Sequence, residues 1–156
     1  MTQAVNKISS VEFQRELMKR RTESQVQAEI TAYLRRSGRP YTITDATVSL
    51  NAKGQRVMRV AEGWPDITTV TKEGRLFAIE CKRPYGGVLR YEQAVCLKRL
   101  SEWGALICIA RGVEDVAISD NLSTHGNIRI SFLEEIERAI AKGPKPKKRS
   151  FKARRL

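Results

Sequence analysis

Hydrophobic residues recur along this chain with two different periods, which separates helical from extended segments. Spacing of three or four residues between apolar positions predicts helices over about 22–34, 91–103, 113–120 and 131–141. Thr22 caps the first of these helices, and Gly38 ends it. The faces expected to be buried are Val26, Ile30, Tyr33 and Leu34 in the first helix, and Ala94, Val95, Leu97, Leu100 and Trp103 in the second.

β-Branched residues and turn residues predict extended segments between these helices. One hairpin is expected with strands near 41–50 and 55–61, and a second with strands Ile67–Thr71 and Leu76–Cys81. Residues 105–110 form a continuous apolar run, which is typical of a strand buried on both faces. This order of elements predicts an α/β domain with a mixed central sheet flanked by helices.

Length and charge divide the chain into one domain and two extensions. The 156 residues have room for a single core, which we place in 22–141, after a weakly amphipathic N-terminal arm over 1–21. Residues 142–156 contain eight Lys or Arg and no acid, and we expect a disordered basic tail there. The whole chain carries a net charge of +12, which favours a polyanionic partner, first of all a nucleic acid.

Several protein classes do not fit this composition. The chain has neither a hydrophobic leader nor an apolar run long enough to cross a membrane, so we expect a cytoplasmic protein. Its cysteines, Cys81, Cys96 and Cys108, are odd in number and lack CxxC spacing. This pattern argues against a disulfide framework and a zinc knuckle, and we expect the thiols to act as small buried hydrophobic groups.

Candidate chemistry is concentrated in the second predicted hairpin. Side chains alternate along a strand, so Glu80 and Lys82 share one face, at the end of the strand where a cleft can form, while Ile79 and Cys81 point to the core. Asp66 begins the partner strand. Two neighbouring carboxylates repel each other unless a proton or cation lies between them, and their oxygens suit Mg²⁺ or Mn²⁺. Such a site hydrolyses phosphodiesters, with Lys82 orienting the nucleophile and stabilising negative charge.

The register of this hairpin decides whether Asp66 joins the site. A two-residue turn at Glu73 and Gly74 would pair Asp66 with Cys81 and place the two carboxylates on opposite faces. A three-residue loop, a bulge, or divergence after Pro65 would bring the carboxylates together. An Asp66 side chain directed into the core would exclude the site.

The first helix offers a third acid. Glu23 and Gln27 are four residues apart, on the side of the helix that carries its apolar stripe, whereas Glu29 lies off that stripe as a solvated charge. Glu23 can be interpreted in two ways: as a carboxylate of the metal site, or as an acid in the first turn that the helix dipole stabilises.

These residues together resemble a known family. The elements in question are Glu23-x-x-Val26-Gln27, Gly63-x-Pro65-Asp66, Glu80-x-Lys82 and Tyr91-Glu92-Gln93. In this order, over about 22–115, they resemble the VRR-NUC (virus-type replication-repair nuclease) branch of the PD-(D/E)xK nuclease superfamily. Trp64 occupies the variable place of the GxPD element, and Tyr91 replaces the Pro or Ser common before Glu-Gln.

The resemblance implies an αβββαβ core, a restriction-endonuclease-like fold. It implies that Asp66, Glu80 and the backbone carbonyl of Cys81 bind Mg²⁺ or Mn²⁺, with Glu23 linked through water. Lys82 is then the catalytic lysine, and Gln93 an accessory residue of the site. The chain is most similar in type to the small, stand-alone, phage-type members of the family, and this resemblance implies a homodimer that cuts branched DNA such as four-way (Holliday) junctions. If the protein is viral, the resemblance also implies that it acts in the cytoplasm of the host cell.

Basic residues outside the motif are candidates for DNA contacts, namely Arg83, Arg90, Lys98, Arg99, Lys145, Lys147, Lys148 and Arg149. Two alternatives stay open. The first is a DNA-binding accessory protein that does not cleave, and the second is a nuclease of the same chemistry acting on flaps, nicks or linear duplex. A dimer interface is expected in the N-terminal arm or in residues 121–141.

Overall fold

A computed structural model of the chain describes residues 9–44, 49–57, 60–122 and 126–146. Its helices are α1 (Ser10–Arg20), α2 (Glu23–Arg36), α3 (Tyr91–Glu102), α4 (Val113–Asn121) and α5 (Ile130–Lys142). Its strands are β1 (Tyr41–Ile43), β2 (Ser49–Leu50), β3 (Arg56–Val57), β4 (Ile67–Val70), β5 (Leu76–Cys81) and β6 (Leu106–Ala110).

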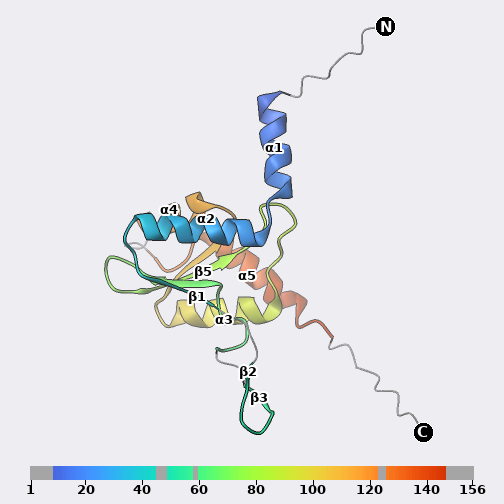
Figure 1. Cartoon of the computed structure of the whole chain (residues 1–156), viewed down its shortest axis with the longest axis vertical. Coiled ribbons are helices and arrows are strands. Elements are labelled where there is room, and N and C mark those ends of the chain that lie inside the picture. Colours follow the sequence, from blue (N-terminus) through green and yellow to red (C-terminus); the bar gives the residue numbers. More distant parts are fainter. Residues whose placement is uncertain (1–8, 45–48, 58–59, 123–125, 147–156) are drawn as a thin grey trace, which may run out of the picture.

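A four-stranded sheet in the order β1-β4-β5-β6 forms the centre of the domain. β1, β4 and β5 are antiparallel neighbours, whereas β6 runs parallel to β5 because α3 carries the chain back across the sheet. Helices α2 and α4 cover one face, and α3 and α5 cover the other (Figure 1). The predicted α/β class with a mixed sheet flanked by helices is therefore confirmed.

Both faces of the sheet are buried where the helices cover them. Every residue of β6 is buried, as the continuous apolar run predicted. On α2 the side chains of Val26, Ile30 and Leu34 are fully buried, and Tyr33 packs against the same core. The core therefore extends from α2 through β5 and β6 to α3.

Trp103 departs from the prediction, because 90% of its surface is exposed. Helix α3 ends at Glu102, and Trp103 is its C-terminal cap residue, beyond the stripe that Ala94 and Leu97 turn toward the sheet. The apolar spacing indicated the helix correctly but could not locate its last buried turn.

The first predicted hairpin is wrong in its extent. Its initial segment splits, so that β1 pairs with β4 in the main sheet, while β2 and β3 form a separate small hairpin. Hydrogen bonds from Thr44 to the carbonyls of Pro65 and Asp66 continue the pairing of β1 toward the start of β4. Residues 45–48 and 58–59 lie outside the described part of the chain.

The described residues of the N-terminal arm and of the C-terminal tail differ in secondary structure. α1 is a helix with a capping box made by Ser9 and Glu12, none of its described residues is buried, and it stands away from the domain (Figure 1). α5 continues to Lys142, one residue into the predicted tail, and 143–146 form neither helix nor strand. The rest of the tail, 147–156, and the start of the arm, 1–8, lie outside the described residues, and no described helix is long and apolar enough to cross a membrane.

Gly63 brings the loop before β4 directly onto α3. Its φ is +77°, and a Cβ atom there would lie 2.2 Å from the carbonyl oxygen of Glu92. That oxygen belongs to the first turn of α3, so no side chain separates the loop from the helix. The close approach sets the position of Asp66, three residues later, relative to α3.

We expect Gly63→Ala to destabilise the fold strongly. Gly104→Ala is the matched control, because Gly104 also has a positive φ (+90°) but nothing lies within 4 Å of a Cβ built there. Both variants bear the cost of a left-handed backbone, about 1–2 kcal/mol, and Gly63→Ala adds a steric cost of about 1–3 kcal/mol. Urea unfolding followed by circular dichroism measures the difference, and equal losses in the two variants would contradict the close contact.

Candidate active site

The turn between β4 and β5 sets the register that the site requires. Thr71 and Arg75 close a three-residue loop, with hydrogen bonds of 2.9 Å from Thr71 N to Arg75 O and 3.0 Å from Gly74 N to Thr71 O. β4 and β5 therefore pair Ile67 with Ile79, and one further step places Asp66 opposite Glu80. Of the alternatives that the sequence left open, the three-residue loop is correct.

Asp66 lies at the start of β4, partly exposed. Its Oδ2 accepts a hydrogen bond of 2.8 Å from the backbone N–H of Cys81. This bond holds the carboxylate across the end of β5 rather than in the core, so the geometry that would have excluded the site is absent. The expected role of the Cys81 carbonyl as a metal ligand stays a prediction.

Glu80 is the most deeply buried acid of the site, with no exposed surface. Its Oε1 accepts a hydrogen bond of 2.7 Å from Lys82 Nζ and another from Gln93 Nε2 on α3. Its Oε2 is also buried and has no hydrogen-bond partner among the described residues. A buried carboxylate oxygen without a protein partner is uncommon in folded proteins, and such an oxygen is free to accept a hydrogen bond from water or to bind a cation.

The structure corrects one expectation about the charged pair. Glu80 and Lys82 share a face, as the strand alternation predicted, but they do not border an open cleft, since Lys82 is only 3% exposed. Helix α3 covers this face and contributes Gln93, which is itself buried. The site is therefore largely enclosed, which strengthens electrostatic interactions inside it.

Gln93 is oriented from its other end by the helix terminus. Its Oε1 accepts a hydrogen bond of 3.0 Å from the backbone N–H of Arg90, the N-cap residue of α3. This contribution of the Arg90 backbone was not predicted from the sequence. The available signal was only half of a capping box, a Gln three residues after the cap position, since the cap residue is Arg rather than Ser or Thr.

Glu23 brings a third carboxylate from the first turn of α2. Its Oε1 lies 3.7 Å from Lys82 Nζ, and 46% of its side-chain surface is exposed. One oxygen each of Glu23, Asp66 and Glu80 lies within 4.8 Å of the other two. Three elements of the fold thus converge on one point, with three acids and a single buried lysine.

The electrostatics of this cluster favour a bound proton or a bound cation. Burial, together with the nearby carboxylate of Asp66, raises the pKa of Glu80 from 4.5 to about 7, against the opposing effect of Lys82. Burial likewise raises the pKa of Asp66, although the Cys81 N–H and Lys82 oppose the shift. A divalent cation beside the unpartnered Oε2 would remove this penalty, and the oxygen donors suit Mg²⁺ or Mn²⁺. The residues present therefore fit such an ion.

Two further polar residues of α2 were considered from the sequence. Gln27 is partly buried, and Glu29 is exposed and paired with Arg21, consistent with a solvated charge.

The three cysteines are free thiols, as predicted, but only two of them are buried. Cys81 and Cys108 are buried, and Cys96 is partly buried. Burial raises the pKa of Cys108 to about 12, which makes this thiol inert at neutral pH.

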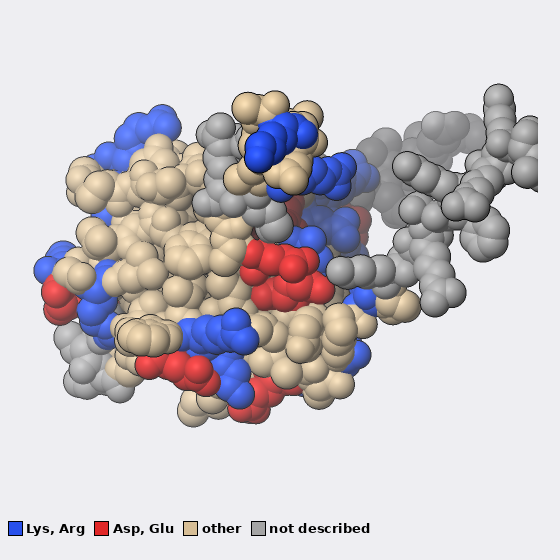
Figure 2. Space-filling model, turned by 90° about the horizontal axis from the view of Figure 1, so that it is seen from below, with Lys and Arg blue, Asp and Glu red and all other residues tan. Residues whose placement is uncertain are grey.

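The predicted DNA-contacting residues within the domain are all on the surface. Arg83, Arg90, Lys98 and Arg99 are exposed, as is Lys145, whereas Lys147, Lys148 and Arg149 lie outside the described residues. Figure 2 shows Lys and Arg side chains of one face in separate groups, with acidic side chains near its middle. On that face, the described residues do not form one continuous basic surface.

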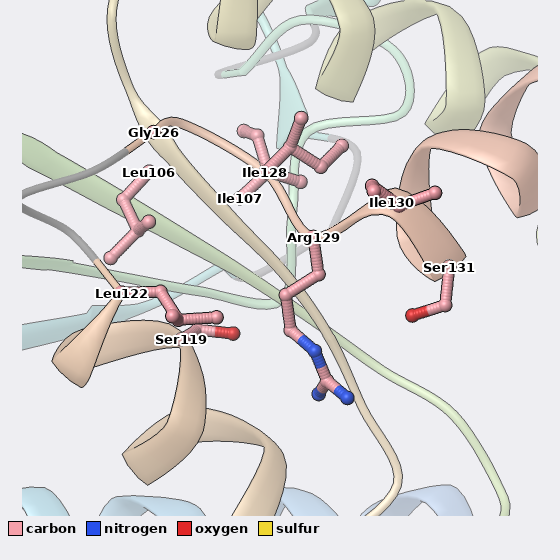
Figure 3. A pocket seen from close by; sticks show the side chains of 9 residues that line it. All are labelled: Leu106, Ile107, Ser119, Leu122, Gly126, Ile128, Arg129, Ile130 and Ser131. Atoms are coloured by element: carbon pink, nitrogen blue, oxygen red, sulfur yellow. The ribbon is translucent and has the colours of Figure 1, made fainter.

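A separate pocket, with a volume of about 400 Å³, lies near the start of β6 (Figure 3). Because β5 and β6 are parallel, this is the opposite end of the sheet from the carboxylates at the end of β5. It is lined by Leu106, Ile107, Ser119, Leu122, Gly126, Ile128, Arg129, Ile130 and Ser131. The guanidinium of Arg129 is already engaged, 3.1 Å from Asp115 and stacked over Phe132. None of these lining residues is an acid, so the described part of this pocket offers no comparable metal site.

Comparison with known proteins gives no match, either among protein-family models, among curated proteins or among solved structures. The function of the carboxylate cluster must therefore be argued from its own geometry and from the motifs that form it.

We expect the raised pKa of Glu80 to make the metal-free protein less stable as pH rises. Below pH 4.5 Glu80 is neutral in both states; between 4.5 and about 7 it is ionised only when the chain is unfolded, so unfolding releases a proton. The free energy of unfolding should fall by roughly 3 kcal/mol over this window because of Glu80 alone.

Denaturant unfolding in EDTA from pH 4 to 8 measures this slope. Glu80→Gln should remove most of the decline, whereas Glu29→Gln, an exposed control, should follow the wild type. Parallel curves for the wild type and Glu80→Gln would show that Glu80 titrates normally.

Proposed function

We propose that this protein is a divalent-metal-dependent DNA endonuclease that hydrolyses phosphodiester bonds. The observation that carries the proposal is the convergence of Glu23, Asp66 and Glu80 within 4.8 Å, beside a lysine that is 3% exposed. A protein that only binds nucleic acid gains nothing from three acids that repel phosphate. A hydrolase gains a cation site and a fixed positive charge at one place.

The order of the elements supports the family suggested by the motifs. Apart from the small β2–β3 hairpin, the elements of the core follow the chain order α2, β1, β4, β5, α3, β6. This is the αβββαβ order of PD-(D/E)xK nucleases. The motif residues lie together, at adjacent ends of β4 and β5 and on the helices that flank them, which supports this family. We therefore propose a VRR-NUC-like nuclease domain.

The proposed metal ligands are Asp66 and Glu80, with Glu23 acting through water and the Cys81 carbonyl as a further ligand. Mg²⁺ or Mn²⁺ bound there would polarise the scissile phosphate and lower the pKa of a coordinated water. Gln93 and Lys82 both donate to Oε1 of Glu80, which fixes that carboxylate and leaves Oε2 for the cation. Glu80 must lose its proton for this, so metal affinity should rise as pH approaches 7.

Lys82 has the second chemical role. Its ammonium group lies 2.7 Å from Glu80 and 3.7 Å from Glu23, so both its position and its charge are defined before substrate binds. In a largely enclosed site this charge would orient the attacking water and stabilise negative charge on the phosphate as the transition state forms.

The substrate we propose is branched DNA, cut by a homodimer. The net charge of +12 supports a polyanionic substrate, and exposed basic residues such as Arg83 and Arg90 border the site along the chain. A two-fold symmetric dimer would present two sites to opposed strands of a symmetric four-way junction. The branched substrate and the dimer follow from the resemblance, and both require a direct test.

Removing the lysine should abolish most of the cleavage without removing the fold. Lys82→Met keeps the apolar stem, and it should lower the single-turnover rate by roughly 100-fold or more. Asp66→Asn should do the same, because it removes a ligand charge. Lys72→Met is the matched control, since Lys72 is exposed in the turn between β4 and β5.

Cleavage is measured with excess enzyme in Mg²⁺, in Mn²⁺ and in EDTA, and circular dichroism checks each variant. Undiminished cutting by Lys82→Met or Asp66→Asn would exclude this site. DNA binding with no cleavage of any substrate in either metal would favour the alternative of a non-cleaving accessory protein.

The choice of substrate is tested with a panel of four-way junction, flap, nicked and linear duplex DNA of matched sequence. We expect paired, symmetric cuts across the junction, together with a dimer in sedimentation analysis. Preference for flaps, nicks or linear duplex would retain the chemistry and overturn the proposed junction specificity.

A further inference from the structure

An open groove runs along the outer side of α3, the helix that contributes Gln93 to the carboxylate site. It has a volume of about 540 Å³, and its walls come from α3 and from the loop before β4. The residues that line it are Ala61, Glu62, Trp64, Tyr91, Glu92, Val95, Cys96, Arg99, Leu100 and Trp103. Most of the helical positions lie on the face turned away from the buried Ala94 and Leu97, and Leu100 at its edge also packs against the core.

Both tryptophans of the chain lie in this groove. Trp103 is 90% exposed, although large apolar side chains are usually covered in a folded domain. Tyr91 adds a third aromatic ring, and Arg99 an exposed guanidinium. Flat aromatic and guanidinium groups that are open to solvent are the groups on which unpaired bases stack.

The groove and the site are built from the same two segments of the chain. Trp64 is two residues before Asp66, and Tyr91 is two residues before Gln93. Gly63 holds the loop of Trp64 against the first turn of α3. From Tyr91 to Trp103 the helix rises about 18 Å, which is long enough for several stacked bases.

The charges of the groove indicate which part of a nucleic acid it would hold. Glu62 and Glu92 line the groove and disfavour phosphate there, whereas Arg99 is the only basic residue among the described residues of the lining. A groove for a duplex backbone would require several cations. The lining therefore fits the faces of bases better than the phosphates of a double helix.

We propose that this groove binds unpaired bases of a single DNA strand next to the cleavage site, by stacking on Trp64, Tyr91 and Trp103. The proposal rests on the nuclease function and specifies its substrate: DNA in which bases close to the scissile phosphate are unstacked, as at a branch point or a frayed end. Recognition by stacking is tolerant of sequence, because every base has an aromatic face.

The test uses the fluorescence of the protein in EDTA, where no metal-dependent cleavage occurs. Because the only two tryptophans line the groove, their emission reports on it directly. Oligothymidylate of about ten nucleotides should quench this emission, whereas an abasic oligomer of equal length and charge should not. Trp103→Ala should weaken binding of the oligothymidylate by roughly 10-fold, measured by anisotropy of a labelled strand, and Trp103→Phe should restore most of it.

Several outcomes would overturn the groove proposal. Equal quenching by the abasic oligomer, equal quenching by a fully paired duplex of the same length, or unchanged affinity in Trp103→Ala would each contradict base stacking. Emission that changes with protein concentration alone, with a matching shift in sedimentation, would assign the groove to a second copy of the chain. Because Trp103 is so exposed, its substitution should leave the circular dichroism spectrum unchanged.

The groove proposal and the nuclease proposal fail separately. Lys82→Met should still be quenched by oligothymidylate, because Lys82 does not line the groove. Quenching in a wild-type protein that cleaves no substrate in Mg²⁺ or Mn²⁺ would retain the groove as a single-strand site and reject the enzyme. Metal-dependent cleavage without any quenching would retain the enzyme and reject the groove.

Discussion

The buried carboxylate of Glu80 is the interaction on which the rest of the site depends. An ionised carboxylate without water is costly, and here one oxygen receives two donors while the other receives none from the described residues. Lys82 compensates only part of that cost, because Asp66 and Glu23 add like charge nearby. A stable core alone would be served as well by an apolar residue at this position. The arrangement is therefore understandable as a site that is completed by something the chain binds.

Two neighbouring features make this burial possible. The three-residue loop closed by Thr71 and Arg75 gives β4 and β5 an even register, so that Asp66 and Glu80 fall opposite each other. The crossover through α3 then covers the face with Gln93, whose amide is held by the N-cap of the same helix. A one-residue change in that loop would reverse the faces of β5 relative to β4 and separate the carboxylates.

Most helices and strands of the core, and part of the site, could be predicted from the sequence. α2, β5 and β6 carry strong periodic or continuous apolar patterns, and the pairing of Glu80 with Lys82 on one face follows from strand alternation. The register of the hairpin could not be read, because two- and three-residue loops both fit Lys72–Arg75. The place of β1 in the main sheet and the exposure of Trp103 depend on tertiary pairing and on the end of a helix, which local periodicity does not encode.

The contact of Gly63 with the backbone of Glu92 has a mechanical consequence. Where a loop and a helix pack through side chains, a change of rotamer can absorb a small shift between them. At Gly63 the backbone of the loop packs directly against the backbone of α3, so no side chain between them can absorb such a shift. The loop that leads to Asp66 and the first turn of α3 therefore cannot come closer to each other without a steric clash. An inward displacement of α3 at this point would press directly on the loop that carries Asp66, so the contact sets a lower limit on the width of the site.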